Sequence, residues 1–510
     1  MCNGRFDRNG PDPDIRGIKA GSEFRLVSVT NPCVLLGRLL QEKGENTWLE
    51  FKTGNDNPEE IGEYISALAN GAMLSDRDRA YLVFGVENKT KEMVGTKVKF
   101  NNKKKGGEDL TNWLSRLVEP KLMLEFLDFE CEGTKFAIVV IEPTYDRPVK
   151  FSGTEYIRIG ENKKKLLEYP EHERALWLAT GRRKFEDAIA LTNKSQAEIL
   201  DIIDPDVHYE LTSESRPKKS SEVIRAMVSA GFIVDNMDGK YDVTNLGAIL
   251  LAKDLTQFPS IAAKSVRVVK YSGKDKSSSE FEQEGKHGYA RGFVGLMRFI
   301  LKNIPTQEIY VDGVRRQSPV YPEIAIREVL ANALIHQDFT ISGAGPLVEI
   351  YANRIEIVNP GNSLIETDRM LNERRSRNEK LAATMRSFGL CEERGGGLDK
   401  TMIAIEQTHL PAPDFISSKN SMRVVLFGPK KFSEMTKQEK QRACFYHCII
   451  RWINHDYMGN ASLRERFLVS DEDYQAVSSV ITEAMRAGRI IPADPKQGKR
   501  NARYVPYWAA

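Results

Sequence analysis

The stretch REVLANALIHQDF, residues 327–339, is the most informative part of this chain of 510 residues. Apolar residues recur with helical spacing over residues 322–336, which predicts an amphipathic helix. Glu328 and Asn332 stand four residues apart and therefore share one flank of that helix. An amide oxygen can ligate Mg²⁺ while a carboxylate one turn away polarises a water molecule, so the pair is a candidate nucleotide site. An ordinary exposed helix flank would show the same spacing.

Strands flank this helix on both sides in sequence, and a turn and glycines follow it, in an order that suits a phosphate ligand. Strands are predicted at residues 265–271, 347–351 and 354–358, and a glycine run that leads into a helix comes at residues 395–397. Backbone N–H groups in such a loop can hold phosphates, although a triple glycine is also common in flexible loops. The further candidate cofactor-binding residues are Asn359, Gly361, Arg377, Asn378, Gly395, Gly396 and Gly397.

The order of these motifs resembles the divergent GHKL-type ATP-binding domain, and the resemblance spans residues 260–430. It implies an α/β sandwich that binds ATP, in which Asn332 binds Mg²⁺, Glu328 activates water and the glycine loop surrounds the phosphates. In the wider family an acidic residue in an Asp-x-Gly-x-Gly box reads adenine. Here the turn at residues 359–361 takes that place.

Three carboxylates mark the first part of the chain. Glu45 lies in a predicted loop, Glu50 on a short strand and Glu87 where a buried strand ends. Side chains from separate segments can converge at such strand ends. Three converging carboxylates could hold Mg²⁺ or Mn²⁺ and activate water at a phosphate, so these are candidate metal ligands and catalytic residues. Solvated carboxylates paired with lysines are the alternative.

The string ENTWLEFK at residues 45–52, ALAN at residues 67–70 and GVEN at residues 85–88 resemble the Schlafen AlbA-type domain. The resemblance implies nucleic-acid binding. In nuclease members of that family, two Glu and one Asp form a metal site that cleaves tRNA or other RNA. Glu45 and Glu50 match the two Glu, and the third position carries Glu in place of Asp.

Local basic segments, rather than overall charge, predict the nucleic-acid contacts. The net charge is only +3, from 74 Lys+Arg against 71 Asp+Glu, which excludes a protein that is basic throughout. Lysine clusters neutralise phosphates without reading sequence, although a single run is as often a solvated loop. The candidate nucleic-acid-binding residues are Lys52, Lys97, Lys99, Lys103, Lys104, Lys105, Lys163, Lys164, Lys165, Lys499, Arg500 and Arg503.

The alternation of helical and strand patterns predicts an α+β multidomain protein. Two segments have the helix–helix–hairpin pattern typical of winged helices, which contact DNA or dock other proteins. The predicted domains in chain order are a polar, disordered leader at residues 1–24, a Schlafen AlbA-like α/β domain at 25–184, a winged-helix-like connector at 185–259, a GHKL-like α/β sandwich at 260–430 and a C-terminal winged helix at 431–510.

These patterns predict a nucleic-acid- and ATP-binding protein of bacterial type. We expect a Mg²⁺- or Mn²⁺-dependent endonuclease that acts on RNA or tRNA and is regulated by nucleotide, as a defence or stress effector. The alternative is a non-catalytic winged-helix transcription regulator whose binding to DNA responds to ATP. We also expect a homo-oligomer. A cytoplasmic location without a membrane partner is expected, because residues 1–20 lack a secretory h-region and no apolar run approaches the roughly 18 residues of a membrane span.

Overall fold

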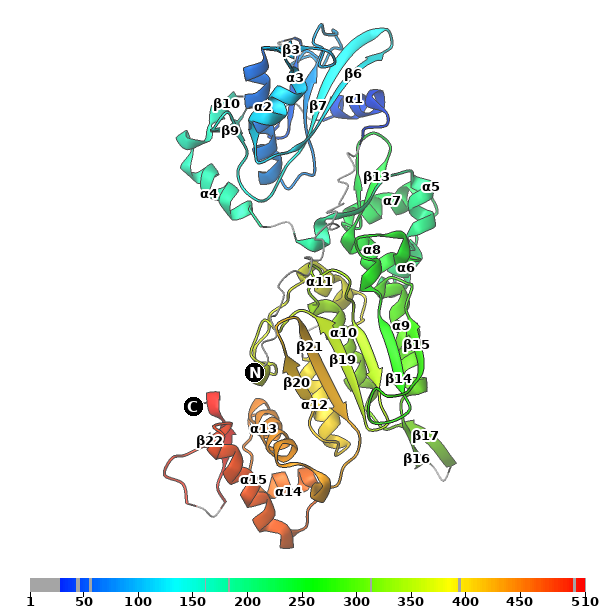
Figure 1. Cartoon of the computed structure of the whole chain (residues 1–510), viewed down its shortest axis with the longest axis vertical. Helices are drawn as coiled ribbons and strands as arrows, with labels where there is room; N and C mark the ends of the chain where they lie inside the picture. Colours follow the sequence, from blue (N-terminus) through cyan, green and yellow to red (C-terminus); the bar gives the residue numbers. More distant parts are fainter. Residues whose placement is uncertain are drawn as a thin grey trace, which may run out of the picture. The chain divides into compact units, whose positions relative to one another are not determined.

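The structure is a computed structural model that describes residues 28–42, 46–54, 57–160, 162–181, 184–311, 314–392, 396–498 and 501–509 (Figure 1). The predicted leader at residues 1–24 lies outside the described residues. The chain divides into two compact units, and each is described by itself. The first contains Gly44–Thr144 and Val149–Tyr169, and the second contains Thr30–Lys43 and Pro170–Ala510.

One sheet of the first unit carries the predicted buried strands. Its strand order is β1–β2–β7–β6, with β1 at Leu49–Lys52, β2 at Ala80–Phe84, β7 at Thr134–Glu142 and β6 at Met123–Cys131. β1 runs parallel to β2, and β7 is antiparallel to both of its neighbours. Every residue of β2 is buried, as expected of an apolar run covered on both faces.

Helix α2 (Pro58–Leu74) joins this sheet to a second one and explains the ALAN sequence. Asn70 on α2 donates from Nδ2 to the carbonyls of Val149 and Tyr156, at 2.9 and 2.8 Å, and its Oδ1 accepts from Val149 N at 2.7 Å. Three buried hydrogen bonds from one side chain fix α2 against the second sheet. That sheet has the order β10–β9–β8–β5, with β10 at Asn162–Lys165, β9 at Thr154–Ile159, β8 at Lys150–Phe151 and β5 at Val118–Glu119.

The remaining elements of the first unit are short. A small hairpin, β3 (Lys104–Lys105) with β4 (Glu108–Asp109), leads into α3 (Leu110–Leu117). The hairpin carries part of the predicted lysine cluster and therefore presents it at an exposed turn.

The second unit begins with the predicted connector. Its strands pair in the order β11–β13–β12, and the β12–β13 hairpin turns at residues 236–240, where Met237 and Gly239 have φ values of +63° and +90°. The elements within the predicted connector are β11 (Ile189–Lys194), α5 (Gln196–Ile202), α6 (Pro205–Thr212), α7 (Ser220–Ser229), β12 (Ile233–Asp235), β13 (Tyr241–Thr244) and α8 (Asn245–Leu251). Helices α1 (Pro32–Leu40) and α4 (Pro170–Ala179) lie in the range predicted for the Schlafen-like domain, yet they belong to the second unit. The helix–helix–hairpin succession is present, and its identity as a winged helix stays a prediction.

A large mixed sheet forms the middle of the second unit. Its order is β15–β14–β18–β19–β21–β20, with β14 parallel to β18 and the other neighbours antiparallel. The strands are β14 (Arg267–Tyr271), β15 (Ser279–Glu284), β18 (Leu347–Ile350), β19 (Arg354–Pro360), β20 (Asp414–Ser417) and β21 (Ser421–Phe427). The three predicted strands are confirmed as β14, β18 and β19.

Helices cover this sheet, and the predicted helix at residues 322–336 is confirmed as α10 (Glu323–His336). Buried apolar residues of α10 belong to the main core of the unit. The other helices are α9 (Tyr289–Asn303), α11 (Glu379–Ser387) and α12 (Gly397–Gln407), and β16 (Thr306–Val311) pairs with β17 (Val314–Pro319) in a separate hairpin. The start of α12 directly follows the predicted glycine run.

The C-terminal module comprises α13 (Lys437–Ile453), α14 (Asn460–Phe467), α15 (Tyr474–Arg486), β22 (Ile490–Pro492), β23 (Tyr504–Pro506) and the short helix η8 (Tyr507–Ala509). Residues 471–473 form a separate 3₁₀ turn ahead of α15. Among the described residues, the helices are too short or too polar to cross a membrane.

Candidate functional site

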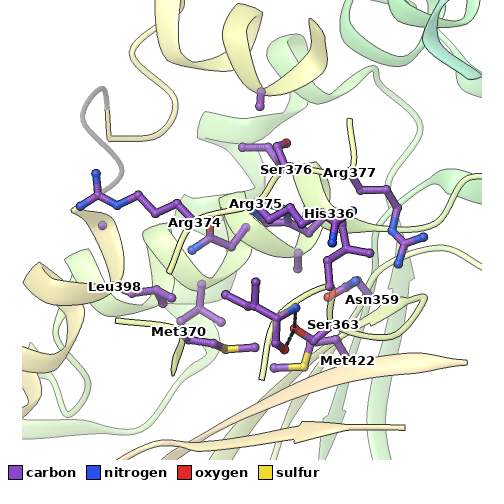
Figure 2. Close-up of a pocket in the computed structure, with 18 of the residues that line it drawn as sticks. His336, Asn359, Ser363, Met370, Arg374, Arg375, Ser376, Arg377, Leu398 and Met422 are labelled. Carbon is purple, nitrogen blue, oxygen red and sulfur yellow. Dashed lines mark hydrogen bonds between the residues drawn. The ribbon is translucent and has the colours of Figure 1, made fainter. Parts of the chain in front are cut away.

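A cavity of about 320 Å³ lies in the second unit, where α10, the end of β19 and the starts of α11 and α12 meet (Figure 2). The residues predicted from sequence that line it are Glu328, Asn332, Asn359, Arg377 and Gly397. Gly361, Asn378 and Gly396 are not among its described lining residues, and Gly395 lies outside the described residues. Motifs spread over 70 residues of sequence are therefore brought to one place.

Glu328 is the most unusual group in this cavity. The residue is 2% exposed, and its Oε1 atom has no hydrogen-bond partner among the described residues. The nearest cation is Arg327, whose Nη1 lies 3.8 Å from that oxygen. Burial raises the pKa of the Glu328 carboxyl group above its ordinary value. A buried acid with a raised pKa is suited to accept a proton from a bound water.

Gly397 has to be a glycine because it packs directly against Glu328. A Cβ atom at Gly397 would lie 2.2 Å from Glu328 Oε2. The carboxylate therefore sits against the first residue of α12, at the helix end where backbone N–H groups are unpaired. Gly397 therefore brings this helix end close to the acid, which is a tighter requirement than loop flexibility.

Arginines surround the other side of the cavity, and most of them were missed in the sequence. Arg374, Arg375 and Arg386 line it together with Arg377. The string NERRSRN at residues 372–378 was the available signal, because it places three arginines within four residues. This density of guanidinium groups makes the cavity a site for an anion.

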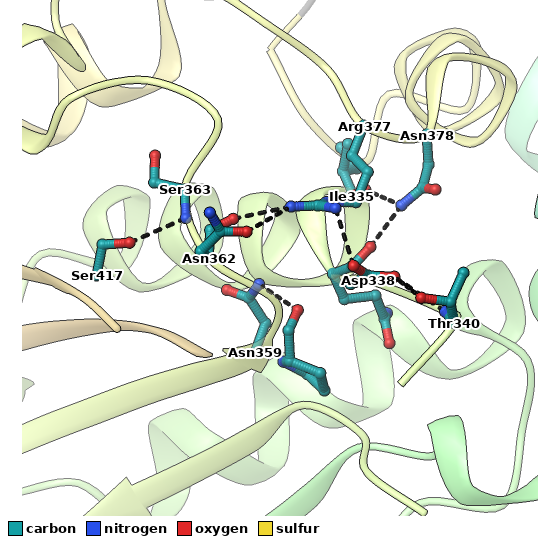
Figure 3. A network of polar contacts seen from close by, with 11 residues as sticks. Ile335, Asp338, Thr340, Asn359, Asn362, Ser363, Arg377, Asn378 and Ser417 are labelled. Carbon is teal, nitrogen blue, oxygen red and sulfur yellow. Dashed lines mark hydrogen bonds and ion pairs between the residues drawn. The ribbon is translucent and has the colours of Figure 1, made fainter. Parts of the chain in front are cut away.

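Arg377 is held in place rather than free to swing. Its Nη1 donates to Asp338 Oδ2 at 2.9 Å, and its Nη2 donates to the carbonyl of Asn362 at 2.9 Å (Figure 3). Asp338 also accepts hydrogen bonds from Thr340 N and Oγ1. Burial alone would raise the pKa of Asp338, but the bonds from Thr340 and the charge of Arg377 keep that pKa below its ordinary value. The guanidinium is therefore pre-positioned at the cavity edge.

His336 adds a neutral group to this positive surface. It lines the cavity at the last residue of α10. Burial, together with the charges of Arg377 and Arg386, lowers the pKa of His336 to about 4. The imidazole is consequently uncharged at neutral pH and can accept a hydrogen bond at the anion site.

Asn378 and Gly361 lie outside the described lining of the cavity and fix the chain next to it. Asn378 Nδ2 donates to the carbonyls of Ile335 and Gln337 at 2.7 and 2.8 Å, so the amide is used to cap the end of α10 (Figure 3). Gly361 has a φ of +94°, and its N–H donates to Asn420 O at 2.8 Å. In the structure Asn378 caps α10 and Gly361 forms a turn, and contact of either residue with a ligand stays a prediction.

Asn359 and an apolar wall form the remaining part of the lining. Asn359 is 5% exposed and donates from Nδ2 to Pro360 O at 3.2 Å. The apolar residues that line this part of the cavity are Leu364, Ile365, Met370, Leu398, Phe415, Met422 and Val424. They come from five separate segments, so no motif could have revealed them. A polar amide beside an apolar wall suits a planar heterocycle.

The predicted carboxylate site of the first unit looks different. Glu50 is 1% exposed on β1 and forms ion pairs with Arg158 on β9 and with Lys52, whose Nζ lies 2.7 Å away. Glu45 lies outside the described residues. Glu87 follows β2, where its N–H donates to Glu92 O at 3.0 Å. The described part of the chain holds no cluster of three or more metal-ligating side chains, and the triad therefore stays a prediction.

Two of the predicted lysine clusters of the first unit reach the same helix. Lys105 Nζ lies 2.9 Å from Glu59, and Lys163 is ion-paired with Glu63, so both bind acids one turn apart on α2. Both Lys52 and Lys163 also lie over the ring of Tyr64, at 4.6 and 4.5 Å from its centroid. The first half of α2 is therefore bordered by basic segments.

Other predicted basic residues remain available to solvent. The exposed ones are Lys97, Lys99, Lys104, Lys164, Lys165 and Arg503, while Lys103 is half-buried. Lys97 and Lys99 alternate with buried Val98 and Phe100, so an extended backbone directs both amino groups outward. Lys499 and Arg500 lie outside the described residues, and the Arg503 guanidinium lies 5.5 Å from the ring centroid of Tyr457.

Two family models match the chain. The one described as "Schlafen, AlbA_2" matches residues 45–167, and the one described as "Putative ATP-dependent DNA helicase recG C-terminal" matches residues 343–426. The second match covers β18 to β21 and so includes most of the cavity lining. A search of curated proteins finds no match.

Solved structures give weaker similarities. The DIP2311 protein from Corynebacterium diphtheriae is 14% identical over 93% of this chain and 96% of that chain, with a TM-score of 0.41. The N-terminal domain of a helicase RecG-related protein from Nitrosomonas europaea is 21% identical over 26% of this chain and 89% of that chain, with a TM-score of 0.18. The two family models carry the assignment. The first unit contains a Schlafen AlbA_2 domain at residues 45–167, and the second unit contains an ATPase-like domain at residues 343–426.

Proposed function

We propose that the protein binds ATP in the cavity of its second unit and nucleic acid through its first unit. The observation that carries the proposal is the convergence of Glu328, Asn332 and several arginines on one cavity. The AlbA_2 and RecG C-terminal family matches support the same pairing of functions.

The lining residues fit a nucleoside triphosphate. Arg374, Arg375 and Arg386 supply donors for phosphate oxygens, and Gly397 at the start of α12 lines the same cavity. The apolar wall would cover the base, with the Asn359 amide at its edge. Glu328 Oε1 has no hydrogen-bond partner among the described residues, and a water bound beside it would supply one.

Mg²⁺ would be held by the amide oxygen of Asn332, with phosphate oxygens completing its shell. The ion would neutralise phosphate charge during hydrolysis. Glu328, one turn before Asn332 on α10, would polarise the attacking water, and its raised pKa favours that proton transfer.

The first unit would bind nucleic acid along the first half of α2. Its basic segments border this part of the helix, and several of their lysines are exposed. Lysine contacts to phosphates carry no sequence information, so we expect binding that depends on salt more than on sequence.

Two more specific functions are compatible with binding of both ATP and nucleic acid. One is a Mg²⁺- or Mn²⁺-dependent RNA or tRNA endonuclease, with Glu45, Glu50 and Glu87 at the metal and ATP as regulator. The other is a non-catalytic regulator that binds DNA in response to ATP. The ion pairs of Glu50 with Arg158 and Lys52 favour the non-catalytic regulator, because a metal ion at Glu50 would have to displace these two cations or share the carboxylate with them.

Calorimetry tests ATP binding. Titration of Mg²⁺–ATP into the full chain should give saturable binding, and Arg374→Ala/Arg375→Ala should weaken it at least about tenfold through lost charge-assisted hydrogen bonds. Arg298→Ala removes an exposed arginine from α9 and should leave the affinity unchanged. Absence of binding by the wild type would overturn the proposal for the second unit.

Salt titration tests the nucleic-acid face. Fluorescence anisotropy with single-stranded RNA and duplex DNA should show weaker binding by Lys164→Ala/Lys165→Ala. The slope of log affinity against log salt should become shallower by about 1.4 to 1.8, as two lost phosphate contacts require. Lys135→Ala, an exposed lysine of the same unit, serves as control. An unchanged slope would remove β10 from the interface.

Cleavage separates the two finer functions. Full-length protein is incubated with tRNA, single-stranded RNA and duplex DNA in Mn²⁺ or EDTA, beside Glu45→Ala and Glu87→Ala. Glu50 is left intact, because its replacement would strand Arg158 in the core. Metal-dependent fragments that both variants lack would establish the nuclease. Intact substrates in every lane, with duplex DNA bound, would establish the regulator.

A further inference from the structure

The walls of the cavity are also the surface on which the C-terminal module packs. Phe415 on β20 and Met422 on β21 line the cavity, and both belong to the apolar cluster that forms the core of the C-terminal module. The rings of Phe415 and Tyr446 on α13 meet edge to face, with centroids 5.9 Å apart. The two parts therefore share one packed layer, in which a change on one side is felt on the other.

The segment that carries the arginines is anchored to the end of the C-terminal module. This arginine segment, residues 367–377, begins with the short helix η5 (Thr367–Arg369) and continues through Met370, Arg374 and Arg375 along the cavity (Figure 2). Asp368 forms an ion pair with Arg489, directly before β22. The Arg369 guanidinium lies 4.9 Å from the ring centroid of Trp508 on η8.

Helix α12 makes a second link between the cavity and the C-terminal module. Gly397 at its first residue packs against Glu328, and Glu406 near its last residue reaches into the C-terminal module. Glu406 Oε2 lies 3.0 Å from His447 Nδ1 on α13, and Oε1 lies 3.5 Å from Arg466 Nε on α14. His447 and Arg466 are both buried, so a shift of α12 would break costly contacts.

We infer that the C-terminal module positions the arginine segment at the cavity, so that occupation of the cavity and the state of the C-terminal module are thermodynamically coupled. The inference rests on the proposed ATP site for its ligand. Asp368 and Arg489 act as positioning residues: they touch the arginine segment or its anchor and not the cavity itself. Because coupling is reciprocal, ATP should tighten the β22–β23 end of the module as the module tightens the ATP site.

Calorimetry and hydrogen exchange on the full chain test this coupling. Arg489→Gln should weaken Mg²⁺–ATP binding about three- to tenfold, within the usual range of coupling between sites. The charge-swapped variant Asp368→Arg/Arg489→Asp should restore binding to within about twofold. Glu483→Gln is the matched control, because it removes an ion pair with Lys437 at 2.7 Å inside the module. ATP should also slow exchange at residues 489–492 and 504–509.

The outcomes separate this inference from the ATP proposal. If the wild type binds ATP, yet Arg489→Gln binds equally well and exchange at β22–β23 is unchanged, the coupling is wrong and the ATP site stands. If the wild type does not bind ATP, the ATP proposal fails. The positioning half is then judged on the nucleotide-free chain, where Arg489→Gln must speed exchange at residues 370–377 while Glu483→Gln does not. Equal exchange there would overturn it.

Discussion

Arg158→Met should lower the free energy of unfolding of the first unit by about 3 to 5 kcal/mol. Arg158 is 2% exposed and Glu50 is 1% exposed, and their ion pair joins β9 to β1. Removal of the guanidinium leaves the Glu50 carboxylate in the interior, with Lys52 as its remaining ion-pair partner among the described residues. The loss should appear in the full chain as exchange about a hundredfold or more faster at the most protected amides of β2 and β7.

A double variant distinguishes an ion pair from a general packing defect. Glu50→Leu/Arg158→Met removes both charges and should recover most of the lost stability, because an apolar pair of similar volume is often as stable as a buried ion pair. Arg116→Met removes an exposed partner of Glu108 and should leave exchange unchanged. If Arg158→Met is silent, or Mn²⁺ protects β1 in the wild type, Glu50 is free to ligate a metal.

The secondary structure near the cavity was predictable because it follows local periodicity. Helix α10 and the strands β14, β18 and β19 lie within a few residues of their predicted positions, since apolar spacing alone determines them. In the C-terminal module, three consecutive acids at residues 471–473 form a 3₁₀ turn ahead of α15.

The site was predictable only where chemistry follows a motif. Glu328 and Asn332 reach the cavity because helical geometry fixes their shared flank, and Gly397 reaches it because a helix starts there. Asn378 was predicted as a ligand contact, yet its amide caps α10, a use that depends on where the chain returns in space. The apolar wall and the anchoring of residues 367–377 depend on tertiary packing and have no local signature.

Glu50 shows that a sequence motif does not reveal the ion-pair partner of its residues. The resemblance to the Schlafen AlbA-type domain suggested Glu50 as a metal ligand, but its ion-pair partner, Arg158, is more than a hundred residues away in sequence. β8 pairs with β9, and Asn70 on α2 donates to the carbonyl of Tyr156 on β9. These contacts place β9, and with it Arg158, beside Glu50. A motif identifies the residue types at a site, whereas their ionic partners come from the fold.

Glu328→Gln should lower ATP turnover by about 10²- to 10⁴-fold, the usual contribution of a positioned general base. Glutamine preserves the volume against Gly397, so ATP affinity should change by less than about threefold, as expected when only the transition state loses an interaction. Glu323→Gln, an exposed carboxylate in the first turn of α10, should turn over ATP as the wild type does. Equal turnover by Glu328→Gln, or none by the wild type, would remove Glu328 from the chemistry.

The same substitution should stabilise the fold with a characteristic pH dependence. Burial raises the pKa of Glu328 above the value of 4.5 expected for the unfolded chain, so the folded state favours the protonated acid. This contribution is fully present below pH 4.5 and is lost as the pH rises through the folded pKa. The melting temperature of Glu328→Gln should therefore match that of the wild type below pH 4.5, exceed it increasingly as the pH rises through the folded pKa of Glu328, and keep a constant lead above that pKa. A pH-independent difference would show that Glu328 is not buried as an acid, whereas the predicted trend would show that its charge costs stability and is retained for function.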